Sequence, residues 1–171
     1  MVRAPGGQHL HGVVKGALKL RILAVGRKPP QWVESGYAEF AKRFPKEMTL
    51  ELHEIPAGRH HGDRAKFVAE EAERLSAKIG KGDWVVALDE RGKAHSSEAL
   101  SARMAQWRMH GGDVSFLIGG ADGLAPSLLA RADETLSLSH LTFPHHLARL
   151  VLAEALYRAW SIGAGHPYHR A

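Results

Sequence analysis

The sequence contains no cysteine. This absence excludes disulfide bonds, thiolate zinc sites and cysteine nucleophiles, and it fits a protein of the reducing cytoplasm. The sequence also lacks a long hydrophobic run, because charged residues interrupt every apolar stretch before it reaches the roughly 20 residues that a transmembrane helix needs. We therefore expect a soluble, cytoplasmic protein with no membrane partner.

The excess of basic over acidic residues is small. The 171 residues include 23 Lys and Arg against 18 Asp and Glu, a net charge of +5. Residues 1–17 contain Arg3 and Lys15 and no acid, so the rest of the chain has a net charge of only +3. Basicity alone is therefore weak support for an RNA partner. Residues 1–17 are rich in Gly and His and predict a disordered extension, and residues 18–171 predict a single domain.

From Leu18 onward, short apolar runs alternate with amphipathic stretches of helical period. The apolar runs predict strands over residues 18–26, 48–55, 84–89, 114–120 and 134–139. Helices are expected between them: over 32–44, after the capping residue Asp63, from Ser96 or Ser97 to 110, from Pro126, and over 146–162. This alternation predicts an α/β fold with a doubly wound, mostly parallel sheet.

The last expected helix has almost no polar face. Eight apolar residues surround it: Leu147, Leu150, Val151, Leu152, Ala153, Ala155, Leu156 and Trp160. A helix of this kind is buried on more than one side. We expect the second cover to be another copy of the chain in a homodimer, and the alternative is a helix buried within one subunit.

Three loops that follow strands compete for a ligand, because ligands of open α/β sheets bind at the carboxyl ends of the strands. The glycine loop "GGADGL" matches neither G-x-x-x-x-G-K-[ST] nor G-x-G-x-x-G, and its Asp122 would repel a phosphate. Residues 136–143 offer hydroxyls, amides and apolar groups, which suit a purine and a ribose. Together with "LDERGK", these loops favour S-adenosylmethionine, whose sulfonium tolerates carboxylates. The alternative is that the glycines only form a tight turn.

Six motifs follow one another along the chain: "AVGRKPPQWVESGYAEFAKRFP", "IPAGR", "ALDERGK", "FLIGGADGL", "LSLSHLTFPHHLARLVLAEALYRAWSI" and "HPYHR". From Leu18 to Arg170 the chain resembles the SPOUT, or α/β-knot, methyltransferases of bacterial ribosomal RNA. The resemblance implies a C-terminal trefoil knot that forms the cofactor pocket, a homodimer, and S-adenosylmethionine as methyl donor. It implies methylation of N3 of a pseudouridine in a hairpin loop of 23S rRNA in the assembled 70S ribosome. Two alternatives stay open: a knotted methyltransferase acting on tRNA or another rRNA base, and a ribosome-binding module without catalysis.

The resemblance also implies roles for particular residues. The expected cofactor contacts are Leu88, Gly119, Gly120, Leu138, Ser139, His140, Leu141, Thr142 and Phe143. Methylation at N3 requires removal of the imide proton, and the polar groups available for this chemistry near the C-terminus are His145, Arg149, Glu154, Arg158, Tyr168, His169 and Arg170.

The "HPYHR" tail is the more favoured of these groups for RNA contact. We expect Tyr168 to stack on an extruded base, while His169 and Arg170 meet phosphate or imide oxygens. The alternatives are that the tail packs on its own subunit and that Glu154 and Arg158, four residues apart, pair on the helix. No metal is expected, because the 12 histidines form no H-E-x-x-H motif and no thiolate is present.

Overall fold

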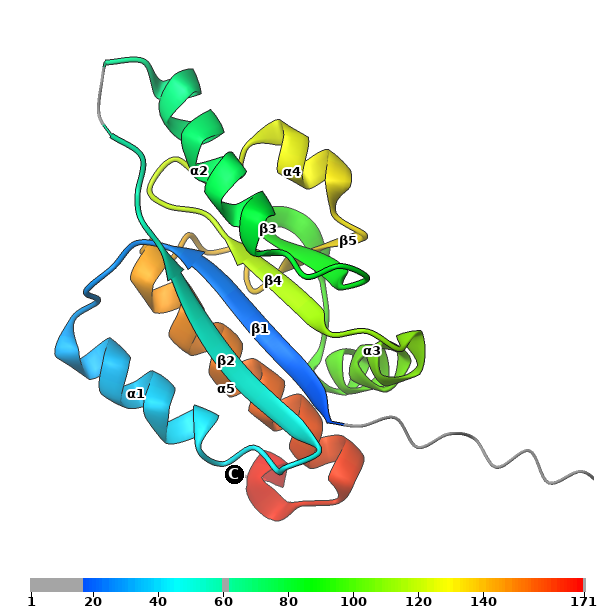
Figure 1. The fold of residues 1–171 in the computed structure, drawn as a ribbon. Helices are drawn as coiled ribbons and strands as arrows, with labels where there is room; N and C mark the ends of the chain where they lie inside the picture. Colours follow the sequence, from blue (N-terminus) through cyan, green and yellow to red (C-terminus); the bar gives the residue numbers. More distant parts are fainter. Residues whose placement is uncertain (1–16, 60–61, 171) are drawn as a thin grey trace, which may run out of the picture.

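The computed structural model of the protein, which describes residues 17–59 and 62–170, consists of a parallel β-sheet with helices on both faces (Figure 1). The strands are β1 (Leu18–Val25), β2 (Met48–Ile55), β3 (Trp84–Ala94), β4 (Val114–Ile118) and β5 (Glu134–Ser137). The helices are α1 (Gln31–Ala41), α2 (Arg64–Lys78), α3 (Ser97–His110), α4 (Pro126–Arg131) and α5 (His145–Ala164), followed by the 3-10 helix η1 (Pro167–Arg170).

The sheet has the strand order β2-β1-β4-β3-β5, and every neighbouring pair is parallel. The carboxyl ends of the strands therefore lie at one edge of the sheet, where the excursion within β3 and the loops that follow β4 and β5 are brought together. This arrangement confirms the α/β class and the parallel sheet expected from the sequence.

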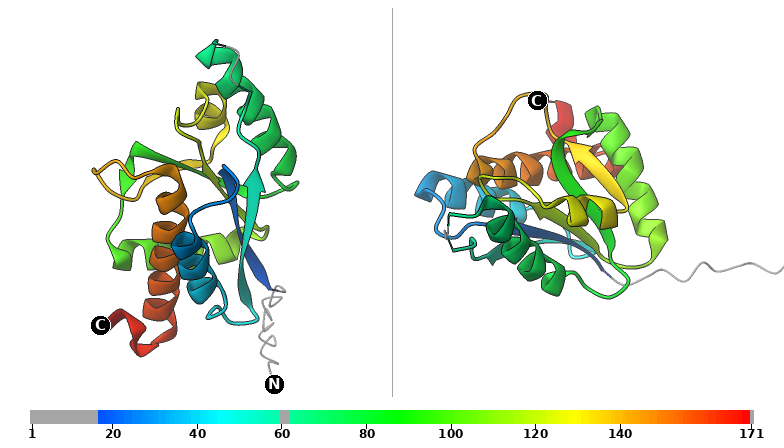
Figure 2. Two further views of the ribbon diagram at one scale, coloured as in Figure 1. Left: turned by 90° about the vertical axis from the view of Figure 1, so that its left-hand side faces the viewer. Right: turned by 90° about the horizontal axis from the view of Figure 1, so that it is seen from above.

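Two hydrophobic cores lie on the two faces of the sheet. Helices α1, α3 and α5 cover one face, where β1 contributes Leu20 and Ile22, and α2 and α4 cover the other, where β1 contributes Leu23 and Val25 (Figure 2). Alternate residues of a strand point to opposite faces, so β1 supplies both cores and is buried from both sides. The doubly wound architecture is therefore confirmed.

The predicted helix caps are present. The carboxylate of Asp63 accepts hydrogen bonds from the amides of Ala65 and Lys66, and the hydroxyl of Ser96 accepts one from the amide of Ala99. Each cap satisfies backbone donors that a helix N-terminus leaves free. Gly111 ends α3 in the left-handed region, with a φ of 103°.

The ends of several elements differ from the sequence-based ranges. Helix α1 ends at Ala41 and not at residue 44, β4 ends at Ile118, and β5 ends at Ser137. The larger difference is in β3, which was expected to end at residue 89 but extends to Ala94. It does so because the chain pairs with β5 a second time, after an excursion over residues 89–92.

No helix in the described part of the chain is long and apolar enough to cross a membrane. The expected N-terminal extension, residues 1–17, lies outside the described residues except for Ala17.

Candidate functional site

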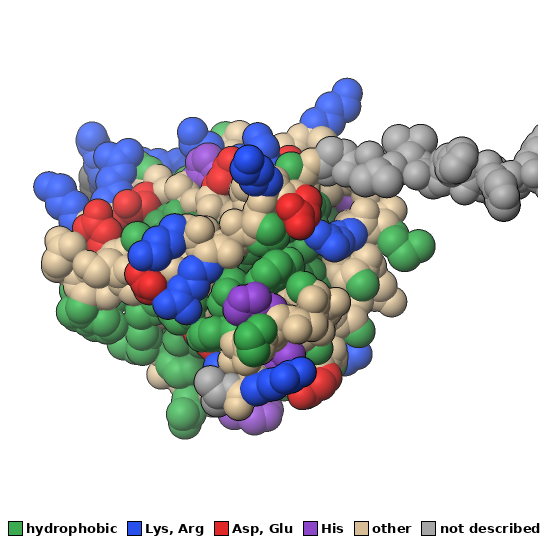
Figure 3. All heavy atoms as spheres, turned by 90° about the horizontal axis from the view of Figure 1, so that it is seen from below, with side chains coloured by type: hydrophobic (Ala, Val, Ile, Leu, Met, Phe, Trp, Pro, Cys, Tyr) green, Lys and Arg blue, Asp and Glu red, His purple; other side chains and the backbone are tan. Residues whose placement is uncertain are grey.

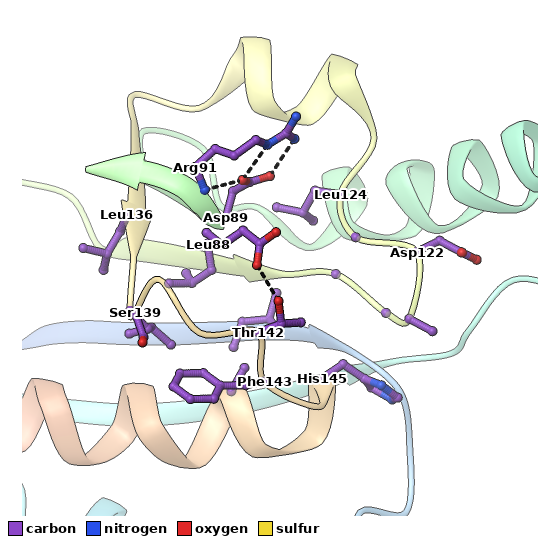
Figure 4. A pocket seen from close by; sticks show the side chains of 18 of the residues that line it. Leu88, Asp89, Arg91, Asp122, Leu124, Leu136, Ser139, Thr142, Phe143 and His145 are labelled. Carbon is purple, nitrogen blue, oxygen red and sulfur yellow. Dashed lines mark hydrogen bonds and ion pairs between the residues drawn. The ribbon is translucent and has the colours of Figure 1, made fainter. Parts of the chain in front are cut away.

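A pocket of about 480 Å³ lies at the carboxyl edge of the sheet, between the excursion within β3 and the loops that follow β4 and β5 (Figure 4). The β3 segment contributes residues 88–91, the segment from the end of β4 contributes residues 118–124, and the loop after β5 contributes Leu138, Ser139 and residues 141–143. The start of α5 and the first residue of α2, Arg64, complete the wall. The three loops that the sequence singled out therefore meet in one site.

The glycine loop folds tightly on itself. The amide of Gly123 donates to the carbonyl of Gly120 at 3.0 Å, and Gly123 has a φ of +76°, which favours glycine. A Cβ on Gly119 would overlap the backbone of Gly123, and one on Gly120 would lie 3.1 Å from the side chain of Val25. The structure thus requires these glycines for the turn itself. A Gly119→Val variant would displace the turn as well as any ligand.

The pocket carries three carboxylates, Asp89, Glu90 and Asp122, and two guanidinium groups, Arg64 and Arg91. Arg91 donates to both oxygens of Asp89 at 3.0 Å, and these hydrogen bonds lower the pKa of the Asp89 carboxyl (Figure 4). Arg64 lies 3.0 Å from Asp122. These residues leave one net negative charge, which favours a ligand that is cationic and not a polyphosphate.

The loop after β5 forms the apolar wall of the pocket. Its conformation is fixed by short polar contacts: the hydroxyl of Ser137 donates to the carbonyl of Ser139 at 3.0 Å, and the hydroxyl of Ser139 accepts from the amide of Leu141 at 2.9 Å. The hydroxyl of Thr142 donates to Glu90 at 2.7 Å and ties this loop to the excursion of β3. The wall is thus built from backbone amides, hydroxyls and apolar side chains, as a nucleoside requires.

A buried cationic group lies behind the pocket. Arg149 of α5 is completely buried and donates to Glu54, at the end of β2, at 3.1 Å and to the carbonyl of Gly26 at 3.0 Å. His145, which lines the pocket, contacts the ring of His146, with 4.2 Å between the ring centroids and an angle of 39° between the ring planes. Burial and the nearby Arg149 lower the pKa of His145, so its ring is neutral at physiological pH and able to accept a proton.

Comparison with known proteins assigns the family. A family model described as "Predicted SPOUT methyltransferase" matches residues 18–169. The chain belongs to the SPOUT methyltransferase family. It is 51% identical over 155 residues to the "Ribosomal RNA large subunit methyltransferase H" of Ralstonia nicotianae, which covers 90% of this chain and 99% of that protein. The proteins of the same name from Hahella chejuensis and Pseudomonas fluorescens are 50% and 46% identical over 155 residues, covering 90% of this chain and 99% and 100% of theirs.

A solved structure has the same fold as this SPOUT methyltransferase. A probable methylase family protein from Haemophilus influenzae Rd KW20 superposes with a TM-score of 0.53 over 90% of this chain and 70% of that chain, at 10% identity. At this identity the likeness concerns the fold alone.

The structure brings most of the predicted cofactor residues of this SPOUT methyltransferase together. Eight of the nine line the pocket: Leu88, Gly119, Gly120, Leu138, Ser139, Leu141, Thr142 and Phe143. His140 is exposed and is absent from the residues that line the pocket. It occupies the turn that the Ser139 hydroxyl closes, so its side chain faces solvent while its neighbours on both sides face the pocket.

The predicted catalytic residues fall into two groups. His145 lines the pocket at the first residue of α5, and the others lie toward the opposite end of that helix or beyond it: Glu154, Arg158, Tyr168, His169 and Arg170. Glu154 is nine residues from His145, about 14 Å along the helix axis at 1.5 Å per residue. One chain therefore brings only His145 of these residues to the pocket.

The tail packs on its own subunit. Arg158 donates two hydrogen bonds to Glu154, at 2.7 and 2.9 Å, and the hydroxyl of Tyr168 donates to the same oxygen at 3.0 Å. The Tyr168 ring contacts Tyr157 edge-on, with 4.7 Å between the ring centroids. Seen from below, this end of the molecule shows histidine and basic side chains among hydrophobic ones (Figure 3). Both structural alternatives from the sequence, the Glu154–Arg158 pair and the packed tail, are present.

Two charged contributors to the site were missed. Arg64 follows the capping residue of α2, far in sequence from the loops, and it reaches the pocket through its ion pair with Asp122. Glu54 is the penultimate residue of β2, and the alternating pattern of that strand gives no indication of a contact with Arg149, 95 residues away. The only sequence signal for the Arg149–Glu54 pair was the position of an arginine within the apolar last helix, since a buried charge requires a partner.

Proposed function

We propose that this SPOUT methyltransferase transfers a methyl group from S-adenosylmethionine to N3 of a pseudouridine in a hairpin loop of 23S rRNA in the 70S ribosome. The observation that carries the proposal is the pocket formed by three loops, with its amide-rich apolar wall and one excess carboxylate. The relatives named ribosomal RNA large subunit methyltransferases, which are matched over nearly their full length, support the substrate class.

The residues present fit the proposed cofactor. The loop after β5 would hold the adenosine between Leu138 and Phe143, and Asp89, Glu90 and Asp122 would face its positive charge. When bound, S-adenosylmethionine supplies an electrophilic methyl group on a sulfonium. The excess of carboxylate over guanidinium favours this cation over the neutral thioether that remains after transfer, which assists product release.

The proposed proton acceptor is the neutral ring of His145. As the N3–CH₃ bond forms and the S–CH₃ bond breaks, the imide N3–H must lose its proton, and His145 takes it up. Burial and, to a lesser extent, the charge of Arg149 lower the pKa of His145 and keep its ring unprotonated beforehand, and Arg149 would stabilise the developing imide anion electrostatically. The chain therefore supplies a base and a fixed positive charge on one turn of α5.

We propose a homodimer in which each pocket receives the tail of the other subunit. Three apolar residues of α5 share one face of the helix and are only half-buried in one chain: Leu147, Val151 and Ile162. An apolar stripe of this kind supports a second copy as cover. The separation of the tail from the pocket along α5 supports a contribution from the partner, because a tail packed beyond residue 164 does not reach His145 of its own chain.

We also propose that residues 18–171 are one domain with a trefoil knot. Leu136 of β5 is opposite both Leu88 and Lys93, and the hydroxyl of Thr142 bonds to Glu90. The chain on both sides of the end of β5 is thus held against the same excursion of β3. This arrangement supports a C-terminal segment that passes through that loop, a rare connection in proteins.

The proposed reaction is tested by incubating the protein with methyl-labelled S-adenosylmethionine and 70S ribosomes from a strain that lacks the activity. Label at one pseudouridine of 23S rRNA is the expected result, and the modified nucleotide is mapped by nuclease digestion and mass spectrometry. Separated 50S and 30S subunits serve as the control for the assembled ribosome. Label in tRNA and none in 23S rRNA would contradict the proposal, and binding to ribosomes without any label would leave a non-catalytic binding module.

The contribution of the partner's tail is tested by mixing two inactive variants. One lacks residues 168–171, and the other carries His145→Ala and keeps its tail. A mixed dimer contains one pocket with an intact His145 that faces an intact tail, so mixing restores up to about a quarter of the wild-type activity of the total protein if the chains exchange at random. No recovery, with mixed dimers demonstrated by mass spectrometry, would contradict a tail shared between subunits.

A further inference from the structure

The turn after β1 is fixed against the histidine that lines the pocket. The amide of Gly26 donates to the carbonyl of Ile55 at 2.8 Å, and its carbonyl accepts from Arg149 at 3.0 Å. A Cβ built on Gly26 would lie 3.0 Å from the ring of His146 and 3.2 Å from that of His145. The segment that follows, residues 27–32, therefore starts from a rigid point beside the proposed reaction centre (Figure 1).

This segment presents two cations without partners. Arg27 and Lys28 are both exposed, and neither makes an ion pair or a hydrogen bond with the rest of the described chain. Lys28 has a φ of +54°, the only residue other than glycine with a positive φ among those described. An L-residue rarely adopts this conformation, and such outliers occur at binding sites that the surrounding structure holds in place. Here the turn at Gly26 and the two prolines that follow Lys28 restrict the backbone.

The segment ends with an exposed aromatic ring. Trp32, on the first turn of α1, is 60% exposed, and it is one of three large hydrophobic side chains in the described residues that are this open to solvent. It lies four residues before Gly36, whose Cβ position is 3.0 Å from Leu150 of α5. Residues four apart lie on the same face of a helix, so Trp32 is on the face of α1 that carries Gly36. It lies one turn closer than Gly36 to the start of α5, where His145 lies.

We propose that residues 27–32 bind an unpaired stretch of RNA beside the target nucleotide, which rests on the ribosomal RNA substrate proposed above. Trp32 stacks on a base, and Arg27 and Lys28 contact the phosphates next to it. An aromatic platform flanked by cations is the combination that holds single strands without reading their sequence. A second copy of this chain is the less suitable occupant, because it would bury two cations for which the segment itself offers no acid.

The experiment compares Trp32→Ala, Trp32→Phe and the double variant Arg27→Ala/Lys28→Ala with the wild type, using 70S ribosomes and saturating S-adenosylmethionine. Met109→Ala removes another exposed apolar side chain, and Lys78→Ala/Lys81→Ala removes two exposed lysines at the amino-terminal edge of the sheet. These two variants are the matched controls. Methylation kinetics, ribosome affinity at several salt concentrations, S-adenosylmethionine affinity by calorimetry and mass by light scattering are measured for each protein.

We expect Trp32→Ala to raise the KM for ribosomes about ten-fold, with kcat, cofactor affinity and mass unchanged, and Trp32→Phe to retain most of the wild-type affinity. The Arg27→Ala/Lys28→Ala variant should lower the slope of log affinity against log salt by about 1.4, since each contact to a single strand contributes about 0.7. The two controls should behave as the wild type.

An unchanged KM in Trp32→Ala together with an unchanged salt slope in Arg27→Ala/Lys28→Ala, in a preparation whose wild type labels 23S rRNA, would overturn this inference and leave the proposed reaction standing. A change of mass in Trp32→Ala would also overturn it and assign Trp32 to an interface between copies of the chain. Absence of label with the wild type would overturn the proposed reaction and this inference with it.

Discussion

Arg149 and Glu54 form an ion pair whose partners differ strongly in exposure: the side chain of Arg149 is 0% exposed and that of Glu54 is 34% exposed. We predict that Glu54→Ala destabilises the fold more than Arg149→Met does. Removal of Glu54 leaves a buried guanidinium without its carboxylate, which costs about 3 kcal/mol. Removal of Arg149 leaves a carboxylate that water can reach and one unpaired carbonyl, that of Gly26, for a cost of about 2 kcal/mol.

The assay is equilibrium unfolding in urea at one protein concentration, supported by thermal unfolding. Each kcal/mol lowers Tm by about 2–4 °C in a chain of this size, so we expect losses of about 6–12 °C for Glu54→Ala and about 4–8 °C for Arg149→Met. The exposed pair of Lys19 and Glu51, 3.9 Å apart, is the control, and each partner's replacement should cost less than about 0.5 kcal/mol.

The double variant Glu54→Ala/Arg149→Met tests the coupling of the two residues. If the cost of Glu54→Ala comes from the orphaned cation, the double variant loses only about as much free energy of unfolding as Arg149→Met alone. A loss equal to the sum of the two single variants, or an equal loss in both single variants, would refute the reasoning from burial.

Three further predictions concern the tail, the pH dependence of the reaction and a buried acid. Deletion of residues 168–171 should leave S-adenosylmethionine affinity within about two-fold, measured by calorimetry, because the tail does not line the pocket of its own chain. The same deletion should abolish methylation of ribosomes, because the proposed dimer places the tail at the pocket of the partner. Arg149→Met should raise the pKa of His145 and move the acid limb of the methylation rate to higher pH, a shift absent if another group is the base. Burial raises the pKa of Glu71, so its contribution to stability is full at low pH and is lost as the pH rises through the folded value. Glu71→Gln keeps an acceptor for the Gly58 amide and does not ionise. In urea unfolding, its free energy of unfolding relative to the wild type should therefore be higher at about pH 8 than at about pH 5, and an equal difference at the two pH values would contradict this.

The sequence predicted the site because parallel strands place their following loops at one edge. Once "LDERGK", "GGADGL" and "SHLTF" were assigned to the ends of strands, their meeting in one pocket followed from the sheet geometry. The strand order did not follow, because β1 pairs with β4, and β3 lies between β4 and β5. These pairings join segments far apart in the chain, and no local pattern specifies them. The second pairing of β3 with β5 was missed for the same reason.

The role of the two leading glycines was harder to predict than their position. A glycine pair at the end of a strand suits either a close ligand or a tight turn, and only the positions of neighbouring atoms distinguish the two. The structure places the backbone of Gly123 against Gly119 and the side chain of Val25 against Gly120. Neither position has room for a Cβ, so both glycines are needed for the turn whether or not a ligand is bound.

The length of α5 connects the chemistry to the proposed assembly. Its 20 residues span about 30 Å, with His145 at the pocket and the tail beyond the other end. The hydrogen bonds among Glu154, Arg158 and Tyr168 hold that distance fixed, because they fasten the tail to the far half of the helix. A chain that keeps these bonds can deliver the tail only to a neighbouring molecule. In the proposed dimer the helix therefore acts as a spacer: the same bonds that keep the tail from its own pocket hold it in place for the pocket of the partner.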